Sequence, residues 1–546
     1  MKPFLTTILL FLVLSLNAQD DFEPATTIPE LQQQLLSMVP DEILVGRNTI
    51  EQSVEFGDQP YDLVLTQIEQ GRKTKESRFE INLAFVNRVF SAEEERDGIR
   101  VKMSSGNMAS FKLEEDGDLK GYKKDCAVIA SDIENGRAIY KILDALQPLT
   151  EAAWEAQINI PEDISGLQDF LKNQVTSFSN GDDGYEQALD FDDSASGLAS
   201  FAITEEGGRK GEVLYRFYFA HLNPSEVEVE VRGTDVELNL STYSRNKYIE
   251  EVEEEDKSFI NKMTIYFPSV EAGQTAAYAV RALIPVAKET YESQMPSFSA
   301  TSAALEELNQ LLSATDLTEY DQSIEPACLT TVNETDNSRS ESEENRYTFD
   351  FSDLDSRKVE LEPKGAAMAV SAETSNNRKY IGLISDGEQG NYDNDLLFYF
   401  ESVLQAQRAQ VAIEYLAKEC PDETPAPDNS TMLDLLAVDN EDLEQEVTFS
   451  DECLCTVRQR AKSGREKEII YEFNLFDLSA GSAEIDISGK KVEVVFETNR
   501  KEEIIQVRED AEEQTYTDEI SLALPDLQSA KQIRSGFKQL IEACDN

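Results

Sequence analysis

The feature of this sequence that most constrains its fold is a strand pattern that occurs four times along the chain. Phe79 lies in an alternating aromatic and polar stretch, and Tyr215, Tyr347 and Tyr471 occupy the same place in three similar stretches. The four stretches are RFEINL (78–83), LYRFYF (214–219), RYTFDF (346–351) and IYEFNL (470–475). Self-similarity of this kind predicts several copies of one folding unit rather than one large domain.

A second motif keeps a fixed distance from the aromatic position in three of the copies. Thr242, Thr374 and Thr498 each lie 27 residues after the tyrosine of their copy. Ungapped matches of that length in three copies are hard to obtain by chance, so these copies can be aligned residue by residue. The first copy has no clear threonine motif and carries an insertion, residues 90–100, after its aromatic stretch.

Helical patterns mark both ends of each copy. A short leucine-rich helix is expected at the start, and a longer pattern begins at Ile133, Val270, Val403 or Leu527 and has a leucine thirteen residues later. We therefore predict four tandem domains, joined by linkers at 147–165, 285–302 and 421–431. The predicted domains are 28–146, 166–284, 303–420 and 432–546.

The residues between the helical patterns have the period of antiparallel strands. Residues 227–231 alternate valine with glutamate, and Gly233 and Gly489 mark turns in the second and fourth copies. A period of two around a turn predicts half-buried hairpins. The predicted fold class is therefore α+β, in which each copy has an N-terminal helix, an antiparallel meander of about six strands and a C-terminal helix.

A strand meander closed by a C-terminal helix resembles the pleckstrin-homology-like fold. The resemblance extends over each repeat at the level of pattern, and the additional N-terminal helix departs from that family. A helix-grip or cystatin-like arrangement accounts for the same pattern almost as well.

The N-terminal residues predict export. Residues 1–18 combine Lys2 with an apolar run and end at Ala18, where cleavage is expected, which is typical of a secretory signal peptide. We therefore expect a protein of the periplasm or the extracellular space. No other stretch approaches the ~20 apolar residues of a membrane-spanning helix, so we expect no integral membrane contact.

The six cysteines of an exported chain predict disulfide bonds, and the alignment specifies the partners. One cysteine of each predicted pair is placed in the first strand of its copy, where CLTTV (328–332) matches CLCTV (453–457), and the other lies four residues after the matched leucine of the last helix. The predicted pairs are Cys328–Cys420 and Cys453–Cys544. For Cys126 and Cys455 two interpretations stay open, either buried free thiols or a bridge between the first and fourth copies.

The charge of the chain limits its partners. With 107 acidic and 49 basic residues, the formal net charge is −58, which opposes general binding to nucleic acid. A functional interpretation of this excess is binding of cations or of a basic partner, and the alternative is solubility alone. The acidic clusters at 180–186 and 250–256 have enough oxygen ligands for Ca²⁺ but lack the fixed spacing of an EF-hand.

Familiar catalytic residues are scarce. His221 is the single histidine, and it stands where the third and fourth copies have Asp353 and Asp477. We predict a solvent-facing position at the end of a strand for His221, no catalytic residues, no metal site and no cofactor. Trp154, the single tryptophan, is expected to pack between the first two copies.

One polar feature recurs in this acidic chain. The turn before the aromatic strand is basic in three copies, at 71–78, 207–212 and 458–467, and the third copy breaks the pattern. In pleckstrin-homology domains the equivalent hairpin holds phosphorylated headgroups, so the resemblance implies a candidate anion-binding or partner-binding site. Its best candidates are Arg458, Arg460, Lys462, Arg465 and Lys467, followed by Arg209, Lys210, Arg72, Lys73 and Lys75. Solvated hairpin tips are the alternative.

Repetition favours a binding or scaffold protein without catalytic activity, because several similar surfaces supply avidity. Its partner would be an unidentified protein or an anionic ligand. The alternative is a carrier that encloses an apolar ligand between the sheet and helix of each module, lined by Phe217, Phe219, Phe349 and Phe351. A hydrolase that uses two carboxylates is the third candidate.

Overall fold

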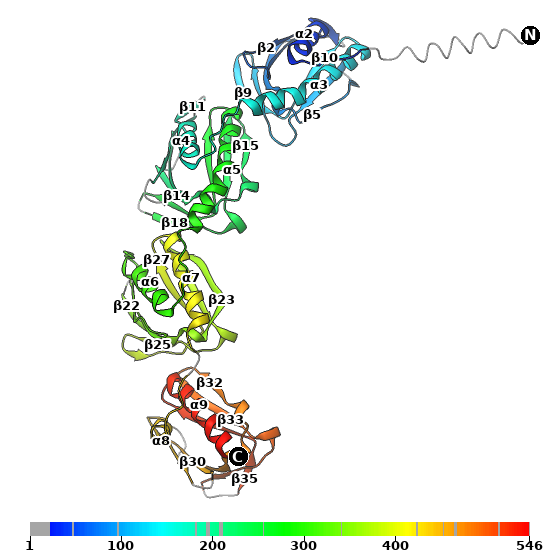
Figure 1. Cartoon of the computed structure of the whole chain (residues 1–546). Coiled ribbons are helices and arrows are strands. Elements are labelled where there is room, and N and C mark those ends of the chain that lie inside the picture. The colour runs from blue at the N-terminus through cyan, green and yellow to red at the C-terminus, as the bar shows by residue number, and fades with distance from the viewer. Residues whose placement is uncertain are drawn as a thin grey trace, which may run out of the picture. The chain divides into compact units, whose positions relative to one another are not determined.

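The computed structural model describes residues 22–45, 48–95, 98–180, 183–192, 197–206, 211–254, 256–339, 341–421, 424–450, 453–462, 467–510 and 514–544. The chain divides into two compact units, Met1–Gln294 and Met295–Asn546. Each unit holds two segments, and each segment begins with a short helix, continues with two antiparallel sheets and ends with a longer helix (Figure 1). We number these segments 1 to 4 in chain order. The predicted signal peptide, residues 1–18, lies outside the described residues.

Segment 1 runs from α2 (Ile28–Met38) to α3 (Ile133–Gln157). Its large sheet has the order β1-β2-β3-β4-β8-β9, and its small sheet has the order β10-β7-β5 with β6 also paired to β7. The strands are β1 (Glu42–Val45), β2 (Asn48–Phe56), β3 (Asp62–Gln70), β4 (Thr74–Asn82), β5 (Arg88–Val89), β6 (Glu93–Glu95), β7 (Gly98–Ser104), β8 (Phe111–Glu115), β9 (Asp118–Lys123) and β10 (Asp125–Ala130).

Segment 2 runs from α4 (Ile164–Gln174) to α5 (Val270–Glu292). Its sheets have the orders β11-β12-β13-β14-β17-β18 and β15-β16-β19. The strands are β11 (Phe178–Asn180), β12 (Asp183–Phe191), β13 (Leu198–Glu206), β14 (Val213–Tyr218), β15 (Glu228–Arg232), β16 (Asp235–Ser241), β17 (Ile249–Glu253), β18 (Asp256–Ile260) and β19 (Lys262–Phe267).

Segment 3 runs from α6 (Thr301–Ser313) to α7 (Val403–Glu419). Its sheets have the orders β20-β21-β22-β25-β26 and β23-β24-β27. The strands are β20 (Tyr320–Ile324), β21 (Leu329–Asp336), β22 (Glu343–Asp350), β23 (Leu354–Lys364), β24 (Ala367–Thr374), β25 (Gly382–Ser385), β26 (Glu388–Gln389) and β27 (Asp395–Phe400).

Segment 4 runs from α8 (Asn429–Leu436) to α9 (Leu527–Cys544). Its sheets have the orders β28-β29-β30-β31-β34-β35 and β32-β33-β36. The strands are β28 (Val438–Asp439), β29 (Leu443–Phe449), β30 (Leu454–Ala461), β31 (Lys467–Asn474), β32 (Glu484–Ser488), β33 (Lys491–Glu497), β34 (Ile505–Glu509), β35 (Thr515–Thr517) and β36 (Glu519–Leu524).

The fold is mixed α and β with antiparallel strand pairs, as the alternating patterns predict. The prediction of about six strands per copy is wrong in number, since each segment has eight to ten strands in two sheets. The missed strands, such as β28 and β35, have two or three residues and so carry no readable alternation. The aromatic stretches of the sequence are β4, β14, β22 and β31 in the large sheets.

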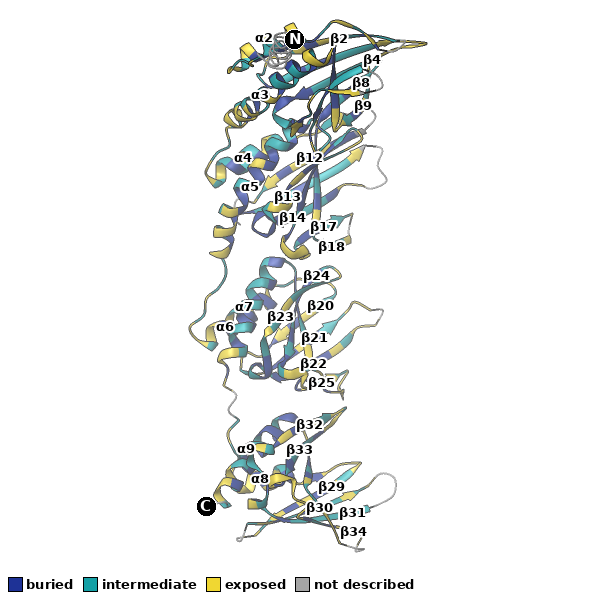
Figure 2. Ribbon diagram, turned by 90° about the vertical axis from the view of Figure 1, so that its right-hand side faces the viewer, coloured by how far each residue is buried: buried dark blue, intermediate teal, exposed yellow. Residues whose placement is uncertain are grey.

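The core of each segment lies between the sheets and the two helices (Figure 2). In segment 4 the α9 residue Phe537 stacks on Phe496 of the small sheet at a centroid distance of 4.8 Å. The closing helices are longer than the sequence predicts in two segments, because α3 continues through Pro148 to Gln157 and α5 continues through Pro285 to Glu292. Trp154 and Tyr291 are buried in these extensions, and their burial offsets the cost of an internal proline.

A buried glutamine joins the two sheets of every segment through its side-chain amide, which bonds one backbone residue of the small sheet in segments 1, 2 and 4 and two in segment 3. In segment 4 the Gln445 side chain donates to the carbonyl of Ala523 over 2.9 Å and accepts from its backbone N–H over 3.0 Å. The side-chain amide therefore replaces a neighbouring strand at the edge of the small sheet. The equivalent bonds join Gln52 to Ile129, Gln187 to Tyr266, and Gln322 to Leu397 and Tyr399.

The threonine motif of the sequence builds a tight turn between the sheets. Thr374 is fully buried, and its hydroxyl donates to the carbonyl of Arg378 over 2.5 Å. The chain between them includes two consecutive residues of positive φ, Asn376 and Asn377. The same hydroxyl bond and two-residue left-handed turn follow Thr242 and Thr498. The fixed spacing of this motif is thus explained by local backbone geometry.

Candidate functional site at the junction of segments 3 and 4

The site begins with a buried ion pair between two segments of one compact unit. Asp353 ends the short 3-10 helix η5 (Phe351–Asp353), which follows the aromatic strand β22. Lys531 lies one turn into α9, and its Nζ is 2.6 Å from Asp353 Oδ2. The two side chains are 3% and 7% exposed, for Lys531 and Asp353 respectively. A charge that is so far removed from water requires a partner of opposite charge.

A tyrosine supplies the second contact of this junction. The backbone N–H of Tyr392 donates to the carbonyl of Gly489, which forms the turn between β32 and β33, over 3.2 Å. The Tyr392 hydroxyl accepts from the backbone N–H of Leu527 over 3.3 Å. This N–H is one of the first of α9, which have no partner within the helix. Burial raises the pKa of Tyr392, so its hydroxyl stays neutral at physiological pH.

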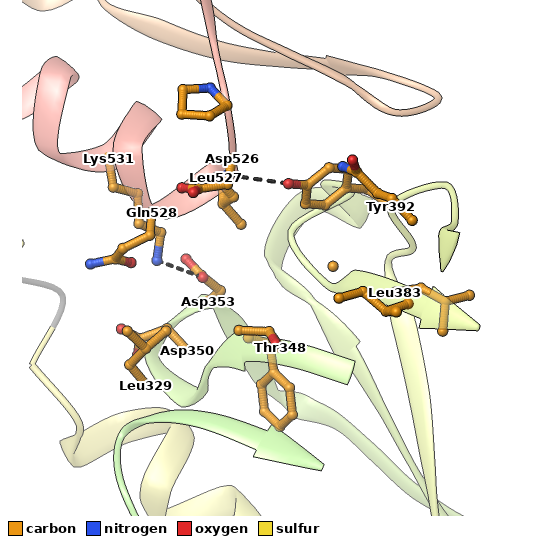
Figure 3. A pocket seen from close by; sticks show the side chains of 15 residues that line it. Leu329, Thr348, Asp350, Asp353, Leu383, Tyr392, Asp526, Leu527, Gln528 and Lys531 are labelled. Carbon is orange, nitrogen blue, oxygen red and sulfur yellow. Dashed lines mark hydrogen bonds and ion pairs between the residues drawn. The ribbon is translucent and has the colours of Figure 1, made fainter. Parts of the chain in front are cut away.

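A cavity of about 370 Å³ lies between these two contacts (Figure 3). Leu329 and Ile384 lie at its edge, where they are 43% and 37% exposed. Its walls are mostly apolar where β21 and β25 begin and β22 ends, and more polar where α9 begins. The lining residues are Leu329, Thr348, Phe349, Asp350, Asp353, Gly382, Leu383, Ile384, Gln389, Tyr392, Pro525, Asp526, Leu527, Gln528 and Lys531. Figure 3 shows the Lys531–Asp353 pair at one side of the cavity and Tyr392 at the other.

Each carboxylate of the cavity already has a partner in the chain. Asp350 accepts from the backbone N–H and the hydroxyl of Ser352, over 2.9 and 2.7 Å. Asp526 accepts from the backbone N–H of Ser529 over 2.7 Å and thereby caps α9. With Asp353 paired to Lys531, the arrangement can hold a ligand or a partner side chain by apolar contact, with negative charge along the rim.

The junction of segments 1 and 2, in the other unit, uses equivalent positions. Tyr122 corresponds to Tyr392, and its backbone N–H donates to the carbonyl of Gly233 over 3.3 Å. Phe85, which corresponds to Asp353, packs together with Tyr122 against the core of segment 2. Gln274 of α5 corresponds to Lys531 and contacts Met108 Sδ at 3.2 Å. The two junctions thus use equivalent positions with different chemistry. The junction of segments 3 and 4 has a buried ion pair, and the junction of segments 1 and 2 has apolar and amide groups at the same positions.

Three basic residues in and beside the basic turn of segment 4 pair with acidic neighbours. Lys462 pairs with Asp439, and Lys467 pairs with Glu509 over 2.6 Å. Arg458 lies 3.6 Å from Glu468, and Arg460 belongs to the same strand. These partners reduce the positive charge that an anion would meet. Arg465 lies outside the described residues.

In the other two basic turns the described cations are at the surface. Lys75 of segment 1 pairs with Glu115 over 2.7 Å, and Arg72 and Lys73 lie in the exposed turn between β3 and β4. Arg209 and Lys210 of segment 2 are outside the described residues. The anion-binding function of these turns stays a prediction.

The remaining predicted positions are part of the cores. Phe217, Phe219, Phe349 and Phe351 are at most 2% exposed and pack in the cores of segments 2 and 3, and Phe349 also lines the junction cavity. The prediction that His221 faces solvent is wrong. It is 8% exposed and makes ring contacts with three tyrosines, because the chain after β14 turns inward under α5. These are Tyr218, Tyr248 and Tyr291.

Trp154 packs mainly within segment 1. Its ring makes edge contacts with Tyr61 and Phe85, each at a centroid distance of 5.2 Å. Phe85 in turn reaches the core of segment 2. The prediction that Trp154 packs between the first two copies is therefore corrected. Trp154 lies in the core of segment 1, where it contacts the junction residue Phe85.

The cysteines form the two bonds Cys328–Cys420 and Cys453–Cys544, with Cα–Cα distances of 5.7 and 6.1 Å. These are the pairs that the repeat alignment predicts, but Cys328 and Cys453 lie just before β21 and β30 and not in the first strand of their segments. Cys126 and Cys455 are free and buried, so no bridge joins the first and fourth copies. Disulfide bonds of this kind fit an exported protein.

No group of three or more His, Cys, Asp or Glu side chains is arranged to hold a metal ion in the part of the chain that the structure describes. Among the same residues, no helix has the length and apolar character needed to cross a bilayer. Part of each acidic cluster predicted as a possible Ca²⁺ site, at 181–182 and 255, lies outside that description.

Comparison with known proteins adds no relative. No protein-family model, no curated protein and no solved structure matches the chain. The site is therefore interpreted from its geometry alone.

Sequence reasoning missed the residues that make the junction. The sequence relates Asp353 only to His221 and Asp477, and Tyr392 and Lys531 belong to no motif. Asp353 and Lys531 are 178 residues apart, so no local pattern relates them. The signal that could have found them is the alignment of the copies. In that alignment Asp353 and Asp477 are equivalent, and Tyr122, Tyr392 and Tyr516 stand at the same distance before the last strand of their segments.

Proposed function

We propose that this chain is an exported, non-catalytic scaffold or binding protein that consists of four copies of one module. Each module has an opening helix, a large and a small antiparallel sheet joined by a glutamine amide, and a closing helix. The four glutamines, the three threonine turns and the two matched disulfides support this repeat organisation. The relation of the module to the pleckstrin-homology-like fold stays a prediction from pattern.

The observation that carries the proposal is the recurrence of one junction. Tyr122 meets Gly233 in one unit, and Tyr392 meets Gly489 in the other, through the same backbone hydrogen bond. A chain whose modules dock by a repeated geometry presents several similar surfaces in series. Such an arrangement serves multivalent binding, in which each further contact is intramolecular.

The junction cavity of segments 3 and 4 is the binding site that we propose. Leu329 and Ile384 offer apolar surface at its edge, and Asp350 and Asp526 add negative charge. The net charge of the chain, −58, adds a long-range attraction for positive partners. We infer a protein partner that inserts an apolar side chain flanked by basic residues.

Site-specific photocrosslinking in the producing cell tests this function. A photoreactive phenylalanine analogue is placed at Ile384, and a matched control is placed at Tyr278 of α5, which is 38% exposed compared with 37% for Ile384. The expected result is a discrete protein adduct at Ile384 and none at Tyr278. No adduct at Ile384, or equal labelling at both positions, would overturn the proposed site.

The apolar wall of the cavity favours a second candidate, a carrier of a small apolar ligand. Phe349 lines the cavity as well as the core, so a ligand would lie between two modules rather than inside one. Native mass spectrometry of the protein from its own source tests this candidate. An added mass that disappears in the Leu329→Arg variant supports the carrier, and a bare chain mass in both proteins excludes it. We do not propose a hydrolase, because the three carboxylates of the cavity are bound by groups of their own chain.

A further inference from the structure

The junctions define two surfaces on each segment. We call the surface around Asp353 and Tyr392 the tail face, since a segment uses it to contact the next one along the chain. We call the surface around the start of the closing helix and the turn of the small sheet the head face, which in segment 4 includes Leu527 and Lys531. In both units the tail face of one segment lies on the head face of the following segment.

The tail face of segment 4 is exposed. Tyr516 occupies the position of Tyr392 and is 54% exposed, and Leu454 occupies the position of Leu329 and is 42% exposed. The corresponding position of Asp353 is Asp477, which is half-buried and follows the 45% exposed Phe476. Ile504, 38% exposed, stands at the position of Tyr380, which packs into the core of segment 4 at the junction described above.

These exposed side chains form most of the apolar surface of segment 4. Of its large apolar residues that the structure describes as exposed, Leu433 alone lies elsewhere, on α8. Scattered exposed apolar residues are normal, but a group that repeats the positions of an existing interface indicates a further contact of the same kind.

The head face of segment 1 has an apolar residue and a basic residue at the positions of Leu527 and Lys531. Ile133 begins α3 at the position of Leu527 and is 37% exposed. Arg137 stands at the position of Lys531 and forms an exposed ion pair of 2.8 Å with Glu134. Such an exposed pair contributes little stability and can be exchanged for a better partner.

We propose that the tail face of segment 4 binds the head face of segment 1 of a second copy of this chain. Asp477 then pairs with Arg137 as Asp353 pairs with Lys531, and Tyr516 packs beside Ile133 as Tyr392 packs beside Leu527. This proposal rests on the four-module organisation proposed above. A head-to-tail contact is heterologous, so it generates an open filament or, if the rotation closes, a ring.

Charge swaps test the contact in the secreted full-length protein. Sedimentation equilibrium at ~0.15 M salt, where the repulsion between two acidic chains is screened beyond ~8 Å, is expected to show a mass that rises with concentration. Asp477→Arg and Arg137→Asp are each expected to weaken association about 30-fold or more, because each leaves a like-charged pair in the contact. Asp434→Arg, an exposed site on α8, is the matched control and should associate like the unchanged protein.

Mixing the two variants gives the decisive comparison. In the mixture the tail face of the Asp477→Arg variant meets the head face of the Arg137→Asp variant with opposite charges. The tail face of the Arg137→Asp variant meets the head face of the Asp477→Arg variant with the original pair of residues. The mixture should therefore associate although each variant alone associates weakly. Only folded variants can give this rescue. A monomer at all concentrations up to ~100 μM, or association that neither swap changes, would overturn the proposal. Ile384 belongs neither to the tail face of segment 4 nor to the head face of segment 1. The photocrosslinking result at Ile384 therefore tests the proposed function separately from this proposal.

Discussion

Lys531 and Asp353 are 178 residues apart in the sequence, and their side chains meet at 2.6 Å in a place that water barely reaches. The ion pair joins the first turn of α9 in segment 4 to the 3-10 helix that follows β22 in segment 3. Because both charges are desolvated, each depends on the other for compensation. The pair therefore couples the folding of two segments.

Lys531→Met is expected to destabilise the unit of segments 3 and 4 by about 3–5 kcal/mol, because Asp353 is left as an uncompensated buried charge. The double variant Asp353→Leu with Lys531→Met should recover most of that loss, since apolar groups of similar size can replace a buried pair. Urea unfolding measures both changes. Lys538→Met on the same helix is the control, and a loss as large as that of Lys531→Met would contradict the role of the pair.

Gly121→Ala should open the junction of segments 1 and 2. A Cβ at Gly121 would lie 2.3 Å from the carbonyl oxygen of Gly233, which is the atom that accepts from the Tyr122 N–H. Gly117→Ala is a matched control, because Gly117 has a similar φ of +85° and its Cβ would meet nothing within 4 Å. Hydrogen exchange at the Tyr122 amide is expected to accelerate at least tenfold in the first variant only. Equal rates in the two variants would show that backbone strain alone is responsible.

Glu334→Gln should stabilise segment 3 at neutral pH. Burial raises the pKa of Glu334, although Gln322, Asn345 and Tyr347 donate hydrogen bonds to its carboxylate. The contribution of a group with a raised folded-state pKa is fully present below its unfolded pKa, about 4.3, and is lost as the pH rises through the folded value. The melting temperature of the variant should therefore exceed that of the parent at pH 7 and converge with it near pH 4.

The other segments support the choice of glutamine at this position. Gln67 and Gln459 occupy it in segments 1 and 4, and each donates to a backbone carbonyl of the small sheet over 2.9 or 2.8 Å. The exposed Glu344 on the same strand as Asn345 is the control for loss of one negative charge. A pH-independent gain in Glu334→Gln would argue against the titration of Glu334 as the cause.

The cysteines should differ sharply in reactivity. Cys126 and Cys455 are buried, and burial raises the pKa of both thiols, so the reactive thiolate is scarce. Mass spectrometry after alkylation should find no labelled cysteine in the native chain and two labels in denaturant without reductant. Labelling of four or six thiols in denaturant would contradict the two bonds.

Replacing the Cys453–Cys544 pair by alanines should cost about 4–5 kcal/mol in the chain-entropy model, since the bond closes a loop of 91 residues.

Gln445→Leu should destabilise segment 4 although it adds apolar surface to a buried site. The substitution leaves the backbone N–H and carbonyl of Ala523 without their partner, at about 1–3 kcal/mol for each unsatisfied group. Gln539→Leu on the exposed side of α9 is the control. Denaturant unfolding of the two variants checks the difference, and equal midpoints would mean that water or a shifted backbone satisfies Ala523.

The fixed spacing of motifs that the sequence reveals is explained by local backbone geometry. The threonine motif recurs at 27 residues from the aromatic position because Thr374 and its equivalents close a turn that tolerates no insertion. The buried glutamines form no motif of fixed spacing, because the number of residues between them and the aromatic position differs among the copies. Gln187, for example, lies 28 residues before Tyr215, whereas Gln322 lies 25 residues before Tyr347.

The sequence by itself determined the α+β class, the register of the aromatic strands and the cysteine pairs, because each depends on periodicity or on spacing within one copy. Only the tertiary structure decided which surfaces meet. The burial of His221, the junction cavity and the pairing of Asp353 with Lys531 arise from packing between elements far apart along the chain. Alternation and helical period report which side of an element is apolar, and they carry no information about which distant element covers that side.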